Sequence, residues 1–168
     1  GQPQEIRPEW KQWSRRTLPM LPVEWPLVVY DKTKDQFETV RKILNSPKVD
    51  RVICATDAGR EGELIFRYIY DASECGKPVA RLWISSLTAD AIQAGLASLK
   101  DSHEYDGLGN AARGRSRADW RGGMNLSRAY SLAFDEALSV GRVQTPPLAI
   151  PVGRGRAVRA FAPGGDGE

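Results

Sequence analysis

Apolar positions in the first hundred residues form two kinds of pattern. Short continuous runs rich in β-branched residues predict buried strands. Longer stretches repeat their apolar positions every three or four residues, which predicts helices with one apolar face. The expected strands are 27–30, 51–55 and 79–84, and the expected helices are 34–45, 61–72 and 88–99. Strands that alternate with helices of this length are typical of an α/β fold, a parallel sheet with flanking helices.

The chain on either side of this region has other patterns. Residues 1–26 hold five prolines and show no period, which predicts an irregular arm over a surface. Residues 108–134 form a longer helical segment that Gly122-Gly123 could interrupt, so a mainly helical part follows the sheet. Beyond Pro151 the chain turns to Gly, Arg and Pro, and we expect a poorly ordered tail. The expected divisions are therefore 1–102, 103–150 and 151–168.

Composition limits the classes of protein that fit. The 168 residues are enough for one well-packed domain and the beginning of a second. The formal charge of +3 is too small to identify a polyanionic partner, so its distribution matters more. Cys54, Cys75 and a single histidine indicate neither a zinc site nor a disulfide framework, which fits a reducing cytoplasm. No apolar stretch has membrane-spanning length and no leader pattern opens the chain, so we expect a soluble, intracellular monomer without a membrane partner.

The turn after the expected strand 51–55 carries several carboxylates. Asp57 ends the strand and Glu61 falls in the first turn of the next helix, so both can point into the crevice where α/β sheets place their chemistry. Mg²⁺ usually takes one or two carboxylates from a protein, beside water and phosphate oxygens. Glu63 lies about 200° around the helix from Glu61, and its better partner is Arg67. The alternative is that first-turn carboxylates merely complement the helix dipole.

Arginines dominate the long helical segment. Residues 113–128 contain five arginines against a single carboxylate, Asp119. In one helix, four of the arginines fall within about 80° of arc, opposite the face of Leu108, Ala111, Ala112 and Leu126. These four are Arg113, Arg117, Arg121 and Arg128. An outward stripe of this kind favours a nucleic-acid backbone, while a solvated surface is the alternative.

Two further groups stand apart from this stripe. Arg115 and Asp119, spaced i and i+4, lie on the small, apolar face, where a charged pair is either a structural bridge or part of a site. Arg142 and Gln144 are donors in a tight, Gly-led turn within residues 138–147 and could reach a nucleic-acid backbone.

The acidic turn also resembles a known signature. Thr56-Asp57-Ala58-Gly59-Arg60-Glu61-Gly62-Glu63 is similar to the acidic segment of the TOPRIM domain, and residues 64–67 and 81–86 look like the topoisomerase III branch of the type IA DNA topoisomerases. The resemblance implies a TOPRIM-like sheet, with Asp57 and Glu61 holding Mg²⁺ near the scissile phosphate and Arg60 close by. Most of the family carries an acidic residue where this chain has Gly59, so one ligand of the commonest pattern is missing.

The second half resembles the same family. The matching segments are 111–113, 115–116, 118–120, 123–125 and 138–146. By this resemblance, residues 103–150 begin a DNA-binding domain, and Arg115, Asp119, Arg142 and Gln144 belong to a groove that holds single-stranded DNA. The family usually has two apolar residues where this chain has Arg121 and Gly122, which should weaken packing there.

The family reaction implies ATP-independent breakage, passage and rejoining of single DNA strands through a tyrosyl 5′-phosphate, with no small-molecule substrate, in the bacterial cytoplasm or nucleoid. None of the five tyrosines lies in the Tyr-Pro-Arg-Thr context of the family's nucleophile, and His103 does not match its catalytic histidine. A preceding strand with another acidic residue is also expected. We therefore expect a fragment that is inactive alone. The rival hypotheses are a DNA-binding module without chemistry, or another TOPRIM protein such as a primase or nuclease, which fits the acidic turn but not residues 138–146.

Overall fold

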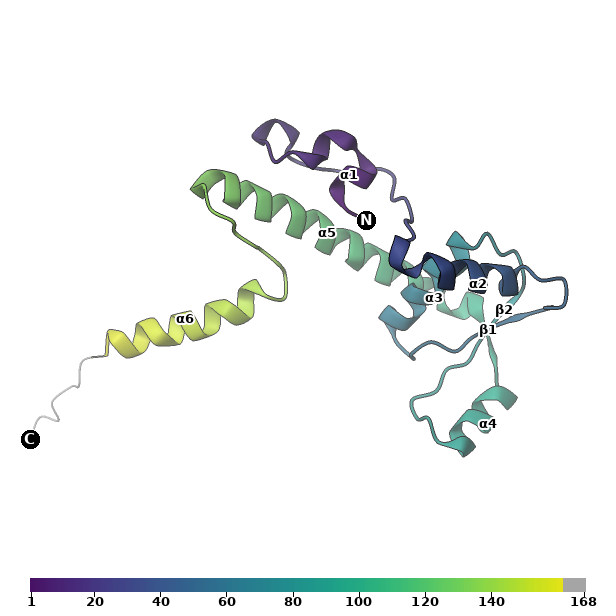
Figure 1. Cartoon of the computed structure of the whole chain (residues 1–168). Helices are drawn as coiled ribbons and strands as arrows, with labels where there is room; N and C mark the ends of the chain where they lie inside the picture. The colour runs from purple at the N-terminus through teal and green to yellow at the C-terminus, as the bar shows by residue number, and fades with distance from the viewer. Residues whose placement is uncertain (162–168) are drawn as a thin grey trace, which may run out of the picture. The chain divides into compact units, whose positions relative to one another are not determined.

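A computed structural model describes residues 1–161, and these form two compact units (Figure 1). Unit 1 comprises Gly1–Ile6 and Glu24–Arg117. Unit 2 comprises Arg7–Val23 and the chain from Ala118 onward. The long helix α5 (Asp106–Phe134) contributes its first part to unit 1 and its second part to unit 2. The tail expected to be poorly ordered is 151–168, and its last part, 162–168, lies outside the described residues.

Unit 1 contains a small mixed sheet with the strand order β1-β2-β3. Strand β1 (Val52–Cys54) runs parallel to β2 (Val79–Arg81), as the sequence predicts. The sequence did not predict β3 (Lys100–Asp101), which pairs antiparallel with β2, so the sheet is not wholly parallel. The two residues of β3 are exposed and polar, which leaves no apolar run to reveal them. Residues 27–30 form no strand; they line an apolar groove beside Phe37 and Ile69, and the prediction there is wrong.

Three helices of unit 1 follow the predicted apolar periods: α2 (Lys34–Leu44), α3 (Arg60–Ala72) and α4 (Ala89–Ala97), and the start of α5 follows them. The short helix α1 (Pro3–Ile6) was not predicted, because it lies in the stretch expected to be irregular. Short 3-10 turns at Asp31–Thr33 and Ser102–Tyr105 precede α2 and α5. Thr88 caps α4, because its hydroxyl accepts a hydrogen bond from the Ala91 amide. Buried apolar side chains of unit 1 include Val52, Cys54, Ala80, Leu82 and Ala112.

Unit 2 joins an N-terminal arm, residues 7–23, to the second part of α5 and to α6 (Thr145–Arg159). The arm contains two short 3-10 turns, Pro8–Lys11 and Arg15–Thr17, and no longer helix or strand. Asn125 on α5 holds this arm through two hydrogen bonds to Met20. The Asn125 side chain accepts from the Met20 amide at 2.6 Å and donates to the Met20 carbonyl at 2.9 Å. Trp10 is buried, with its ring 6.3 Å from that of Trp120.

Helix α5 ends at Phe134 as the sequence predicts, whereas α6 extends into the expected tail. Helix α5 continues without interruption through Gly122-Gly123, because the hydrogen bonds within a helix join backbone groups and need no side chain. Helix α6 continues through Pro151 to Arg159, where we expected poor order. Prolines in its first turn cost little, because first-turn amides have no intrahelical acceptor. Among residues 1–161 there is no helix with the length and apolar character to cross a membrane.

Candidate metal and nucleic-acid site

The acidic turn connects β1 to α3 and is held tightly against the first turn of that helix. A Cβ on Gly62 would lie 2.2 Å from the carbonyl oxygen of Asp57, so the backbones meet where only glycine fits. The Thr56 hydroxyl adds a second tie by donating to the Gly62 carbonyl at 2.8 Å. Gly59 is the N-cap residue of the helix, in extended conformation, and nothing lies within 4 Å of the position that a Cβ on it would take. The backbone of Asp57 is therefore held against Gly62, the residue that follows Glu61.

Asp57 and Glu61 supply the carboxylates of this turn. Both residues are exposed, and neither forms an ion pair within the described part of the chain. Arg60, the first residue of α3, is exposed between them. Residues 1–161 contain no cluster of three His, Cys, Asp or Glu side chains arranged for a metal. Two carboxylates on one tight turn nevertheless suit Mg²⁺, which completes its shell with water and phosphate oxygens.

Arg81 organises the turn from the neighbouring strand, and sequence reasoning missed it. This side chain on β2 is 1% exposed, and Nη1 donates to the carbonyls of Cys54, Thr56 and Leu82 at 2.8–2.9 Å. Nη2 donates to the Asp57 carbonyl at 2.7 Å. The Trp83 ring covers the guanidinium at 4.9 Å. A charged residue in a short apolar run was the one available signal, because such a charge is rarely buried unless it is paired.

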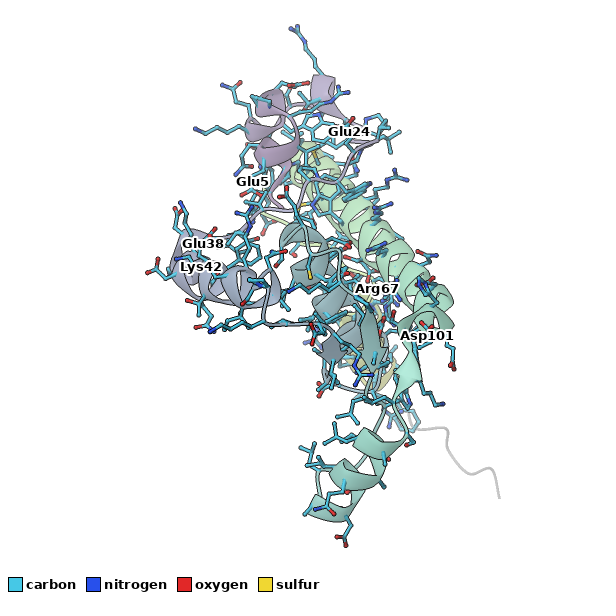
Figure 2. The ribbon with its side chains drawn as sticks, turned by 90° about the vertical axis from the view of Figure 1, so that its right-hand side faces the viewer. Glu5, Glu24, Glu38, Lys42, Arg67 and Asp101 are labelled. Carbon is cyan, nitrogen blue, oxygen red and sulfur yellow. The ribbon has the colours of Figure 1, made fainter. Side chains whose placement is uncertain are left out.

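A chain of ion pairs extends from Arg81 into α5. Glu63, which is buried, contacts Arg81 Nε through Oε2 at 3.1 Å and accepts a hydrogen bond from Arg67 Nε at 2.7 Å. The predicted pairing of Glu63 with Arg67 is thus confirmed. Arg67, labelled in Figure 2, also contacts Asp106 at 2.8 Å. Burial lowers the pKa of Arg67, but its hydrogen bonds to Glu63 and Asp106 outweigh that effect, and the pKa is raised overall.

The four-arginine stripe of α5 is only partly open to solvent: Arg117 and Arg121 are exposed, Arg113 is half-buried and Arg128 is buried. Arg113, in unit 1, forms an ion pair with Asp71 at 2.5 Å, and the Arg117 guanidinium lies 5.5 Å from the Trp25 ring. In unit 2, Arg121 donates to the Pro22 carbonyl at 2.8 Å, and Arg128 is buried. The opposite face is only partly buried, since Ala111 and Leu126 are exposed. Arg113 and Arg128 depart from the predicted outward stripe because a carboxylate and a carbonyl from other segments take the place of water around them.

The Gly-led turn brings three of the predicted residues together in unit 2. Arg142 makes a two-pronged contact with Asp119, through Nε at 2.5 Å and Nη2 at 3.1 Å. These hydrogen bonds raise the pKa of Arg142. Gln144 donates to Ser139 and lies against Gly141, where a Cβ would come within 3.0–3.1 Å of the glutamine side chain. Asp119, Arg142 and Gln144 line one open hollow, whereas Arg113, Arg115 and Arg117 belong to unit 1.

Two serines on α5 position this turn, and the sequence analysis did not identify them. Ser127 bonds both the amide and the carbonyl of Val140, at 2.9 and 3.2 Å. One helical turn later, Ser131 bonds both groups of Leu138, at 2.9 and 3.1 Å. Residues 138–140 are therefore hydrogen-bonded along α5 just before the chain reaches Arg142. The i, i+4 spacing of the serines was a signal, although serine in a helix more often faces water.

Two family models match the chain. The model described as a Toprim domain matches residues 11–87, which include the acidic turn. The model described as DNA topoisomerase matches residues 103–165, which include the Gly-led turn. The α/β unit with its acidic turn matches the Toprim model, and the residues after it match the topoisomerase model. The chain is therefore a segment of a DNA topoisomerase that carries a Toprim domain.

Curated relatives place the chain more narrowly. It is 47% identical over 161 residues to the DNA topoisomerase 3 of Shouchella clausii, covering 96% of this chain and 22% of that protein. It is 45% and 44% identical to the DNA topoisomerases 3 of Staphylococcus haemolyticus and Staphylococcus aureus, with 96% of this chain and 23% of each relative covered. The chain belongs to the type IA DNA topoisomerases, in their topoisomerase III branch. It spans between a fifth and a quarter of the length of these relatives.

Proposed function

We propose that the parent protein is an ATP-independent isomerase that breaks one DNA strand, passes another through the gap and rejoins the ends through a tyrosyl 5′-phosphate. The observation that carries this proposal is the acidic turn, with Asp57 and Glu61 exposed where β1 meets α3. Family membership supports it. No tyrosine of this chain has the family's nucleophile context, so the proposed share of this segment is to hold the metal and the strand.

Asp57 and Glu61 are the proposed Mg²⁺ ligands. Bound there, Mg²⁺ would offset negative charge on phosphate oxygens near the reacting bond. The Asp57 carbonyl already accepts hydrogen bonds from Arg81 and from the Gly59 amide, so Asp57 would bind through its carboxylate. Arg60, exposed at the start of α3 and next to Glu61 in the sequence, would contact the same phosphate.

The proposed path of a single strand includes the Gly-led turn. Arg142 donates hydrogen bonds to Asp119 through Nε and Nη2. Its Nη1 makes no hydrogen bond within residues 1–161, so Nη1 would be the donor to a phosphate. Asp119 would fix the direction of the guanidinium, and Gln144 would add a neutral contact from the same hollow.

Arginines of unit 1 are proposed as further contacts to DNA. Arg115 and Arg117 lie on the first part of α5 and would bind phosphates there. Arg113 would have to release Asp71 before it could do the same.

Fluorescence anisotropy with a labelled single-stranded oligonucleotide tests this proposal. We expect Mg²⁺ to increase the affinity of the 168-residue chain for the oligonucleotide, because the ion would be shared between Asp57, Glu61 and a phosphate. Asp57→Asn should abolish that Mg²⁺ response, whereas Asp35→Asn, which changes an exposed carboxylate on α2, should retain it. An equal Mg²⁺ response in Asp57→Asn would overturn the metal assignment.

A plasmid assay with the same chain separates the rival functions. We expect no relaxation of negatively supercoiled plasmid, since the nucleophile is not among its tyrosines. Mg²⁺-dependent hydrolysis of the oligonucleotide would instead favour a nuclease.

A further inference from the structure

Positive charge is divided unequally between the two units. The described residues of unit 2 contain ten Lys and Arg against four Asp and Glu. Unit 1 contains 14 Lys and Arg against 15 Asp and Glu. The small positive charge of the whole chain therefore conceals a strongly cationic unit, and a unit of this kind attracts polyanions.

The arm carries much of this charge on its surface. Arg7, Lys11, Arg15 and Arg16 are all exposed, and side chains with nitrogen at their tips project from the violet N-terminal segment in Figure 2. Arg7 and Arg16 line one hollow of about 270 Å³. The one carboxylate of the arm, Glu9, contacts Arg7 at 3.6 Å, with both side chains more than half exposed. Such a pair is weak and leaves Arg7 available to a phosphate.

An exposed aromatic ring lies on the same arm, above a buried cation. The Trp13 ring is 51% exposed, and the guanidinium of Arg128 lies 5.3 Å from its centre. Arg128 is 4% exposed and donates to the Trp10 carbonyl, yet it forms no ion pair within residues 1–161. Burial lowers its pKa. The guanidinium therefore lies against the Trp13 ring from within the unit, and the exposed part of the ring is available to a ligand.

We propose that the arm is a binding surface for single-stranded nucleic acid, in which Trp13 stacks against an unpaired base and Arg7 and Arg16 hold neighbouring phosphates. Alternating aromatic and cationic groups are the usual means of binding single strands without sequence preference. The bonds between Met20 and Asn125 hold the arm on α5, so this surface exists before the strand arrives. The inference rests on DNA as the proposed partner and adds a contact outside the acidic and Gly-led turns.

The test measures the affinity of the 168-residue chain for a labelled oligothymidylate of about 15 nucleotides at several KCl concentrations. Arg7→Ala/Arg16→Ala should bind about tenfold more weakly. Its slope of log affinity against log salt should flatten by about 1.4, because each phosphate contact to a single strand contributes about 0.7. The matched control, Lys32→Ala/Lys48→Ala, removes two exposed cations from unit 1 and should keep the wild-type slope.

Trp13 is tested by its own pair of variants. Trp13→Ala should lose about tenfold in affinity, together with part of the tryptophan quenching that the oligonucleotide causes. Trp13→Phe should recover most of the affinity, because a phenyl ring still stacks. Circular dichroism checks that each variant is folded.

The outcomes separate this inference from the proposed function. If both arm variants bind like the lysine control while Arg142→Ala weakens binding, the arm surface is refuted and DNA binding stands. If the wild-type chain binds no oligonucleotide at low salt, both fail. Equal competition by duplex and single-stranded DNA would refute the role of Trp13, because paired bases cannot stack on it.

Discussion

The buried guanidinium of Arg81 donates a hydrogen bond of 2.7 Å to the main-chain carbonyl of Asp57, the residue at the head of the acidic turn. The same side chain holds the carbonyls of Cys54 and Thr56. One residue of β2 therefore shapes the backbone that presents a candidate metal ligand. Arginine suits this position, because its planar fork of donors can reach several fixed acceptors at once, which a lysine ammonium cannot.

We expect Arg81→Lys to loosen the acidic turn. Lysine would leave several buried carbonyls without donors, at a cost of about 1–3 kcal/mol each where water cannot reach them. Amide hydrogen exchange in residues 55–62 should accelerate roughly tenfold or more, which a local loss of about 1.4 kcal/mol would produce. The control is Arg67→Lys, which perturbs the same Glu63 without a bond to the turn. Equal acceleration in both variants would show that Arg81 has no special hold on Asp57.

Two glycines of the turn should respond oppositely to alanine. Gly62→Ala would place a methyl group against the Asp57 carbonyl and should lower the free energy of unfolding by about 1–3 kcal/mol. Gly59→Ala enters open space in extended backbone and should be neutral or stabilise by up to about 1 kcal/mol, through the unfolded state. Urea denaturation measures both, and a tolerant Gly62 would contradict the close approach described above.

Gly59 also allows a gain-of-function experiment. Because nothing lies within 4 Å of the position that a Cβ on this residue would take, Gly59→Asp should fold and add a third carboxylate to the turn. We expect Mg²⁺ affinity, measured by titration calorimetry, to increase severalfold. Gly59→Asn, which has the same shape without the charge, should not show the increase. Equal Mg²⁺ affinities in the two variants would place the ion elsewhere.

Ser131→Ala should release the chain that leads to Arg142. The buried hydroxyl bonds both main-chain groups of Leu138, so its loss should cost about 1–3 kcal/mol and speed hydrogen exchange in residues 138–144. Ser98→Ala removes an exposed hydroxyl that bonds only within α4 and its cap, and it should change neither quantity. If the two variants behave alike, the turn is held by other contacts.

Asp106 should make the stability of unit 1 sensitive to acid. Hydrogen bonds from Arg67, then from His103, lower the pKa of its carboxyl. A lowered native pKa means that the stabilisation is complete above the unfolded value of about 3.9 and is lost as pH falls through the native value. The difference in unfolding free energy between the wild type and Asp106→Asn should therefore shrink progressively as pH falls below about 5. If this difference in unfolding free energy stayed constant with pH, the ion pair of Asp106 with Arg67 would not be its cause.

Local patterns were sufficient for much of the fold and for part of the candidate site. The apolar periods predicted α2, α3 and α4, and the pairing of Glu63 with Arg67 followed from one turn of helix. The residues of the acidic turn pointed to the Toprim class before any coordinates, because residues 56–63 resemble the acidic segment of that domain. The assignment of Asp57 and Glu61 to Mg²⁺ remains a prediction.

Only the tertiary structure decided which charged side chains are buried and what they hold. Arg81 meets the turn across 24 positions of sequence, and Arg128 meets Trp10 across 118, so no local period could reveal either contact. The run at 27–30 had the composition of a strand but found no neighbour to pair with in the described residues. Periodicity records which faces avoid water, whereas hydrogen bonds between distant segments depend on how those segments are brought together.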